Sequence, residues 1–504
     1  MSPKVLSFSE KLMRENPIAH RYIATATQAV KHKVPDNLKD AVTNPELESW
    51  FRKEAGKRLA LIKPGMSEKE IKDIIETANR FPNGSMTPIS LEQMKNMREF
   101  CPSVEALLER AKHGVELMKT NPNHEYLGTV GRAVPAGGGS TRGASWAVDN
   151  PELARKYGIS ENTSRYLYKA GRRTLITNTL ELSINIARAV GKVFPNIIMS
   201  NSETVKAMME TVKAEWGNMT TEEALNTVFF NQIVMPRMWV KDQQMILDKL
   251  FPAGHGDFPY LVSKYQMAKT LKECGIKYLL YSNADEWLWQ ADPIVISIAQ
   301  QLFDEGHHML IVGVENFDKI PGGGFMRLTN GRQTLVETPR LPSQIIKEHN
   351  VPEAVNTTFY VIDVDYLAEH ESELMNVDKS IVVKTIPGRS GEGSKEQIVG
   401  VDSWAGDVFA DVLNPAFIKW PNMNFLGIKH MGHIIDSVPE AFLGGRTRLH
   451  YVHESLAIYS TLIKRLIKGD REVAEYLFNT NYSYVNPVMS SGSQNDSARK
   501  DRNK

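Results

Sequence analysis

Short apolar runs separated by helical patterns are the main feature of the middle of this chain. They lie at residues 196–199, 278–281, 309–314, 358–362 and 381–383. A continuous apolar run between turn signals is typical of a strand that is buried on both faces. Strands that alternate with helices predict a parallel or mostly parallel sheet. We therefore expect an α/β domain over residues 121–410.

The regions on either side of this domain have a different pattern. Residues 1–120 have apolar positions every three to four residues, and Ser67 with Glu70 forms a capping-box pattern, so we expect a helical packing or oligomerisation layer. Residues 411–489 predict a mixed and helical C-terminal region, with its clearest helix over 455–468. Residues 490–504 have no apolar content and predict a disordered tail. Glycine and serine over 386–399 predict a loop.

Composition narrows the class of protein. The net charge of the 504 residues is +1, so no overall field favours nucleic acid or an anionic membrane as a partner. Only two cysteines occur, which fits a reducing compartment and excludes a disulfide framework. No apolar run is long enough to span a membrane, and the N-terminus lacks a signal-peptide core. We expect a cytoplasmic protein.

A turn of small residues and a strand end mark the first candidate site. Residues 254–257 read Gly-His-Gly-Asp before a helical run, and the next strand ends at Ser-Asn-Ala-Asp, residues 282–285. Ligands of open α/β sheets bind outside the carboxyl ends of the strands. Asp285 is therefore a candidate ligand of a metal at a phosphate site. The alternative is that it only begins a turn.

Residues 134–143, Val-Pro-Ala-Gly-Gly-Gly-Ser-Thr-Arg-Gly, form the second candidate. A glycine-rich turn lets backbone N–H groups approach phosphate oxygens, and Arg142 adds charge. The spacing matches neither a P-loop nor a dinucleotide-binding fingerprint, so a flexible connection is the alternative. Further on, Gln232 follows an apolar run, where its amide could contact a base edge or merely cap the strand.

Polar residues also follow later strands. They are Glu337, Asn356, Lys384 and Asp402. Carboxylate and amide groups can hold sugar hydroxyls, and a lysine can neutralise phosphate charge. Asp402 could join Asp285 on one divalent cation, because hard cations prefer oxygen ligands.

The order of these motifs resembles the UDP-glucose pyrophosphorylase family of eukaryotic type, over roughly residues 126–410. The resemblance implies a GT-A-like nucleotidyltransferase fold with a mixed, mostly parallel sheet, and a reaction of UTP with a hexose 1-phosphate, glucose 1-phosphate being favoured. It implies nucleotide binding by Ala136, Gly137, Gly138, Gln232, Gly254 and Asp285. It implies sugar-phosphate binding by His255, Asn283, Glu337 and Asn356. Lys384, Arg142 and Arg173 would act at the phosphates, and Asp285 with Asp402 would hold Mg²⁺.

The chemistry of such a reaction suits these residue types. An oxygen of the sugar phosphate attacks the α-phosphorus of UTP, and pyrophosphate leaves. Positioning and charge neutralisation dominate phosphoryl-transfer catalysis. No general base is needed, because the attacking phosphate is already ionised.

The chain also departs from the family. The first loop reads Val-Pro-Ala-Gly-Gly-Gly rather than Leu-Asn-Gly-Gly-Leu-Gly, and the nearest equivalent of the following basic segment, residues 169–176, is displaced by more than twenty residues. Arg173 stands there in place of a lysine. No C-terminal β-helix repeat is visible, so the oligomeric state is open.

Two alternatives remain at this stage. A GT-A glycosyltransferase would use an Asp-x-Asp signature, which Asp363 and Asp365 could supply. A non-catalytic relative that binds nucleotide or sugar phosphate would explain the altered first loop.

Overall fold

The structure is a computed structural model. It describes residues 6–16, 23–26, 40–63, 66–67, 70–71, 98–99, 107, 109–111, 128–138, 141–160, 163–170, 173–189, 191, 193–215, 219–283, 293–315, 323–329, 331–337, 354–375, 380–389 and 394–420.

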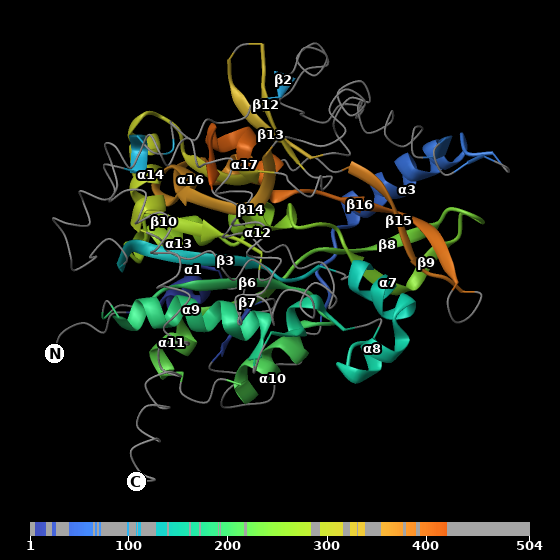
Figure 1. Ribbon diagram of the computed structural model, residues 1–504, viewed down its shortest axis with the longest axis horizontal. Coiled ribbons are helices and arrows are strands. Elements are labelled where there is room, and N and C mark those ends of the chain that lie inside the picture. Colours follow the sequence, from blue (N-terminus) through green and yellow to red (C-terminus); the bar gives the residue numbers. More distant parts are fainter. Residues whose placement is uncertain are drawn as a thin grey trace, which may run out of the picture.

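An eight-stranded sheet forms the centre of the molecule, in the order β1-β7-β6-β3-β10-β14-β11-β17 (Figure 1). Its strands are β1 (Ile23–Thr25), β3 (Val130–Pro135), β6 (Asn196–Ser200), β7 (Thr227–Asn231), β10 (Tyr278–Tyr281), β11 (Met309–Glu315), β14 (Ala354–Asp363) and β17 (Pro415–Trp420). Strands β1 and β14 run antiparallel to their neighbours, and the other strands are parallel to one another. The expected mixed, mostly parallel sheet is confirmed.

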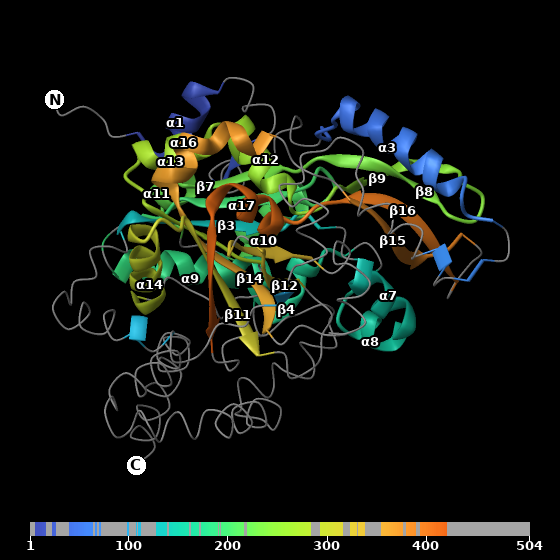
Figure 2. The same ribbon diagram turned by 90° about the horizontal axis from the view of Figure 1, so that it is seen from above.

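Helices cover both faces of this sheet (Figure 2). One face carries α1 (Phe8–Glu15), α12 (Asp257–Lys264), α13 (Met267–Glu273), α16 (Val364–His370) and α17 (Ala405–Leu413). The other carries α9 (Leu175–Ala189), α10 (Val205–Glu215), α11 (Thr221–Leu225) and α14 (Pro293–Asp304). The strands are mostly apolar because both of their faces are buried, and the exceptions include buried polar residues such as Arg132 and Asn196.

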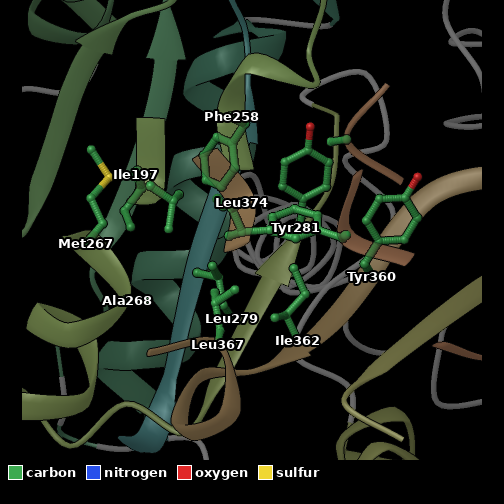
Figure 3. Packing of buried hydrophobic residues seen from close by; sticks show 14 of the residues in the cluster. Ile197, Phe258, Met267, Ala268, Leu279, Tyr281, Tyr360, Ile362, Leu367 and Leu374 are labelled. Atoms are coloured by element: carbon green, nitrogen blue, oxygen red, sulfur yellow. The ribbon is translucent and has the colours of Figure 1, made fainter. Parts of the chain in front are cut away.

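The core between the sheet and the first helical layer is rich in aromatic rings. Tyr281 of β10 and Tyr360 of β14 are neighbours in the sheet register, and their rings stack with centroids 5.3 Å apart and planes 3° apart (Figure 3). Phe258 of α12 meets the ring of Tyr281 edge-on at 5.0 Å. These contacts fix β10 and β14 at the point where both approach the site described below.

A second sheet, of order β15-β16-β8-β9, extends to one side of the first (Figure 1). Its strands are β8 (Val234–Trp239), β9 (Met245–Pro252), β15 (Ser380–Pro387) and β16 (Lys395–Asp402), all antiparallel. Helix α3 (Pro45–Leu59) packs on one face, while α7 (Thr141–Asp149) and α8 (Pro151–Lys156) lie on the other side (Figure 2). Smaller elements are β2 (Arg98–Glu99), β12 (Gly324–Arg327), β13 (Gln333–Val336), β4 (Lys169–Ala170), β5 (Arg173–Thr174), η4 (Arg165–Leu167) and η6 (Glu371–Met375).

The predicted strands are all present. Three of them match the observed bounds to within one residue, whereas β14 begins four residues before the predicted start and β15 ends four residues after the predicted end. The Ser67–Glu70 capping box is also confirmed, with the Glu70 N–H donating to Ser67 Oγ at 3.3 Å. The loop predicted over 386–399 is wrong in extent, because β15 runs to Pro387 and β16 begins at Lys395. These strand ends lie at the margin of the second sheet, where polar side chains meet solvent and no apolar pattern is required.

Other predictions stay untested. The helix over 455–468 and the tail over 490–504 lie outside the described residues. The domain limits near residues 120 and 410 remain predictions, although α1 and β1 pack into the large sheet and its first helical layer. Within the described part of the chain, no helix is long and apolar enough to cross a membrane.

Candidate functional site

The strand order reverses direction at β3, because β6 and β10 pair with its two sides. Crevices at such a switch point, outside the carboxyl ends of the strands, are the usual ligand sites of open α/β sheets. The glycine-rich turn follows β3 directly, and Ser282 and Asn283 follow β10. The fold therefore brings two of the predicted motifs to the same edge.

The turn after β3 is fixed by two buried amide side chains. The carbonyl oxygen of Gly137 accepts hydrogen bonds from Asn201 Nδ2 at 2.7 Å and from Gln232 Nε2 at 2.9 Å. A Cβ atom at Gly137 would lie 2.6 Å from Gln232 Oε1, so only glycine fits there. Predicted residues Ala136, Gly137, Gly138 and Gln232 are thus brought together. Gln232, which is 1% exposed, holds the turn in this conformation through its hydrogen bond to the Gly137 carbonyl.

A segment rich in tyrosine and arginine covers this turn. Tyr166 of η4 donates a hydrogen bond to the carbonyl of Pro135 at 2.8 Å. Tyr168 places its hydroxyl against Gly143, in the first turn of α7. Arg173 belongs to the same region, since the Leu175 N–H donates to the Tyr168 carbonyl at 3.0 Å. The backbone of Arg142 lies in the first turn of α7, but its side chain is outside the described set.

The Gly-His-Gly-Asp turn packs against the end of β16. A Cβ atom at Gly254, whose φ is +102°, would lie 2.2 Å from Asp402 Oδ1. His255 Nδ1 accepts a hydrogen bond from the Ala405 N–H at 3.1 Å, at the start of α17. Lys384 of β15 donates a hydrogen bond to Asp402 Oδ2 and forms an ion pair with it. The structure therefore brings Gly254, His255, Lys384 and Asp402 into one cluster.

Charge in this cluster is balanced around Asp402. Burial favours the neutral acid, but Lys384, His255 and Arg237 together hold the pKa of Asp402 below its ordinary value. Arg237 of β8 is only 3% exposed, and burial lowers its pKa to about 10 against the opposing effect of Asp402. The Arg237 guanidinium also lies over the ring of Phe251 at 4.5 Å. Asp402 is thus an ionised carboxylate among cations.

Two of the predicted sugar-binding residues, Glu337 and Asn356, meet at a bulge in β14. Asn356 Nδ2 approaches Glu337 Oε1 at 3.5 Å and donates to the Tyr360 hydroxyl at 3.0 Å. The register of β14 against β11 shifts here, and Thr358 adopts a φ of +64°, which is strained for a β-branched residue. Strain of this kind is retained where the surrounding structure imposes a particular side-chain direction.

A continuous set of contacts joins these groups. The Ala253 N–H donates to the carbonyl of Ile233, the residue after Gln232, at 3.1 Å. At the other end, a Cβ atom at Gly406 of α17 would lie 2.5 Å from the Tyr360 hydroxyl. The glycine-rich turn, the His255 cluster and the Asn356 bulge are therefore parts of one packed edge.

The structure describes only one of the two carboxylates predicted to hold a metal. Asp285 lies outside the described residues. Asp402 Oδ1 accepts from the Ser403 N–H at 3.1 Å and Oδ2 accepts from Lys384, so a cation would compete with the Lys384 ammonium group for the carboxylate. No group of three or more His, Cys, Asp or Glu that could hold a metal occurs in the part of the chain that the structure describes. The metal role of Asp285 and Asp402 stays a prediction.

The alternative Asp-x-Asp signature lies at the wrong edge. Strand β14 runs antiparallel to β10 and β11, so its end at Asp363 is at the amino edge of the parallel strands. There Asp363 Oδ1 accepts from the N–H groups of Asp365 and Tyr366, at 3.1 and 3.3 Å. Asp363 caps α16, which is a structural role.

Some site residues had no role in the sequence-based prediction. Asn201 follows an apolar run, as Gln232 does, and that signal could have identified it. Arg237 follows Pro236 in a strand, and only the fold shows it near Asp402. Nothing in the sequence indicated that Tyr166 and Tyr168 cover the glycine-rich turn.

The edge combines groups for two kinds of ligand. Glycine backbone, a helix N-terminus and arginine side chains suit phosphate oxygens. The Glu337–Asn356 pair presents an acceptor and a donor, which suits hydroxyl groups. The fold and this edge together define an α/β protein with its ligand site at a strand-order switch point.

Comparison with known proteins agrees with this class. The family model described as UTP–glucose-1-phosphate uridylyltransferase matches residues 173–447, more than half of the chain. The chain therefore belongs to the UTP–glucose-1-phosphate uridylyltransferase family. No curated protein matches it in a sequence search.

Solved structures show the same fold at low identity. A UDP-N-acetylglucosamine pyrophosphorylase from Entamoeba histolytica is 17% identical, with a TM-score of 0.50, over 66% of this chain and 83% of that one. A variant of the UDP-glucose pyrophosphorylase from Leishmania major is 15% identical, with a TM-score of 0.50, over 78% of this chain and 79% of that one. The expected nucleotidyltransferase-like fold is confirmed, and the low identities fit a divergent member of the family.

Proposed function

We propose that this protein is a uridylyltransferase that joins UTP and a hexose 1-phosphate to give a UDP-sugar and pyrophosphate. Membership of the family supports the class of reaction. The observation that carries the proposal is the single packed edge that unites the Gly137 turn, the His255–Lys384–Asp402 cluster and the Glu337–Asn356 pair.

Each group of site residues would bind a different part of the two substrates. The turn at Ala136 to Gly138 and the first turn of α7 would receive the UTP phosphates, and Gln232 and Gly254 would bind the uracil. His255 contacts the phosphate of the sugar. Glu337, Asn356 and Asn283 bind hydroxyl groups.

Lys384 is the main cation at the reacting phosphates. A phosphate oxygen of the sugar 1-phosphate attacks the α-phosphorus of UTP, and the bond to pyrophosphate breaks. Lys384 leaves Asp402 to reach the phosphates, while the buried Arg237 continues to compensate the carboxylate. Lys384 is 31% exposed as a side chain, so it has room to move.

Mg²⁺ is part of the proposal. When bound, it would neutralise charge on the phosphates, with Asp285 as its protein ligand. Glucose 1-phosphate is the proposed sugar substrate, on the strength of the Gly-His-Gly-Asp motif at residues 254–257 and the Phe-Asn-Gln sequence at residues 230–232.

The test is pyrophosphate release by the purified chain with Mg²⁺, UTP and either glucose 1-phosphate or N-acetylglucosamine 1-phosphate. Lys384→Ala should reduce the rate by about 10²–10³-fold, the loss usual for one charge-stabilising group. Lys53→Ala, at an exposed position of α3, is the matched control and should keep full activity. UTP binding without pyrophosphate release from any sugar phosphate would instead support the non-catalytic alternative.

A further inference from the structure

The hydroxyl of Tyr168 is a buried polar group with no hydrogen-bond partner among the described residues. The residue is 0% exposed, and its oxygen makes no hydrogen bond within that part of the chain. An unsatisfied buried hydroxyl typically costs about 1–3 kcal/mol. A buried hydroxyl of this kind needs an explanation, and one explanation is a binding site in which a ligand accepts the missing hydrogen bond.

The position of this hydroxyl points to the kind of ligand. It lies against Gly143, where a Cβ atom would be only 2.1 Å from it. Gly143 is the third residue of the nine-residue helix α7. The first four N–H groups of a helix have no partner within the helix, and they favour an anion there.

Positive charge is near the same point. Arg165 influences the ionisation of Tyr168, and its Nη2 donates to the Tyr166 hydroxyl at 3.3 Å. Burial raises the pKa of Tyr168, so its hydroxyl stays protonated and remains a donor at neutral pH. A donor, a helix N-terminus and a guanidinium together suit a phosphate oxygen.

We propose that Tyr168 is a further binding residue, whose hydroxyl donates a hydrogen bond to a phosphate oxygen of UTP at the first turn of α7, with Arg165 supplying charge. This inference rests on the proposed function for the identity of the ligand. The UTP polyphosphate is favoured over the sugar phosphate because Tyr168 lies against Gly143, in the first turn of the helix that follows the Gly137 turn, and its neighbour Tyr166 binds the Pro135 carbonyl. The Glu337–Asn356 pair lies instead after β13 and on β14.

The first test compares wild type with Tyr168→Phe, and uses Tyr157→Phe at an exposed position as the control. Affinities for UTP and for pyrophosphate are measured by calorimetry, KM is measured for UTP and for the sugar phosphate, and stability is measured by chemical denaturation. Tyr168→Phe should weaken UTP and pyrophosphate binding by about tenfold or more, the value of a hydrogen bond to a charged group. The KM of the sugar phosphate should not change, and the variant should be as stable as wild type or more stable.

Other outcomes overturn the proposal. Unchanged UTP affinity would remove Tyr168 from the site, and a loss of stability would show that its hydroxyl has a structural partner. A raised KM for the sugar phosphate alone would show that the Tyr168 hydroxyl binds the phosphate of the sugar and not a phosphate of UTP. If wild type binds UTP but releases no pyrophosphate, the uridylyltransferase proposal fails, while the comparison of UTP affinities still decides the role of Tyr168.

A second test uses the close contact itself. Gly143→Ala should weaken UTP binding, because the added methyl group collides with the Tyr168 hydroxyl. In the Tyr168→Phe background the same change should cause a smaller loss, because the colliding oxygen is absent. Strictly additive effects of the two substitutions would refute the contact.

Discussion

Replacement of Asp402 by asparagine tests the charge balance of the site most directly. The substitution keeps the size of the side chain but removes the negative charge that faces Lys384, His255 and Arg237. Lys384 can turn toward solvent, because its side chain is 31% exposed. Arg237 cannot, because it is 3% exposed and one of its guanidinium nitrogens, Nη1, finds no hydrogen-bond partner among the residues that the structure describes.

The expected cost is therefore that of a buried cation left without its counter-charge. Breaking a buried ion pair from one side costs about 3–5 kcal/mol. The pKa of Asp402 is held below its ordinary value of 3.8. Its stabilisation is thus fully present above that ordinary value, and is lost as the pH falls through the lower pKa of the folded state. The difference between wild type and variant should be complete at pH 7 and should shrink in acid.

The assay is chemical denaturation of wild type, Asp402→Asn and the double variant Asp402→Asn/Arg237→Met at pH 7. The double variant should recover part of the lost stability, because the unpaired cation is gone. Asp149→Asn, which breaks the exposed pair with Lys395, is the control and should cost no more than about 1 kcal/mol. A loss below about 1 kcal/mol in Asp402→Asn, or no recovery in the double variant, would refute the reasoning.

Two further predictions concern backbone and ionisation. Gly254→Ala should abolish UTP binding and lower the free energy of unfolding, because the added methyl group would collide with Asp402 and Ser403. The control Gly275→Ala also has a positive φ, of +79°, but open space around it, and should lose only about 1–2 kcal/mol of stability. UTP binding and chemical denaturation measure both effects, and equal losses of stability in the two variants would contradict the prediction. Burial raises the pKa of Glu371 from 4.5 to about 7. Below pH 4.5 this group should therefore stabilise the folded state by on the order of 3 kcal/mol relative to alkaline pH. That stabilisation should be lost as the pH rises from 4.5 through 7. Glu371→Gln should therefore show a smaller decline in unfolding free energy between pH 5 and 8, and identical slopes would disprove the assignment.

Much of the central sheet could be predicted from local pattern. The runs at 196–199, 278–281 and 309–314 are apolar because each strand is covered on both faces, so the period of the sequence reports burial directly. The second sheet was largely missed. Strand β9 mixes buried and exposed positions irregularly, and β16 begins with Lys-Glu-Gln, so neither has the continuous apolar run that marked the central strands.

The sequence predicted which residues belong to the candidate site better than it predicted which of them contact one another. Glycine at positions 137 and 254 is dictated by space and by backbone angle, which a turn motif indicates. That Gln232 binds the Gly137 carbonyl, and that Lys384 pairs with Asp402, depends on strands that are far apart in the chain. No local pattern encodes such distances.

The sequence by itself determined which segments are strands, where polar residues follow them, and which motifs are those of the family. These properties depend on side-chain period and turn chemistry, which act over a few residues. Only the tertiary structure decided that β14 runs antiparallel, which places Asn356 at the ligand edge and Asp363 at the opposite one. It also decided that Tyr168 lies against Gly143. Strand direction and packing partners are set by how distant elements bury their apolar faces together, so they emerge only when the whole chain is folded.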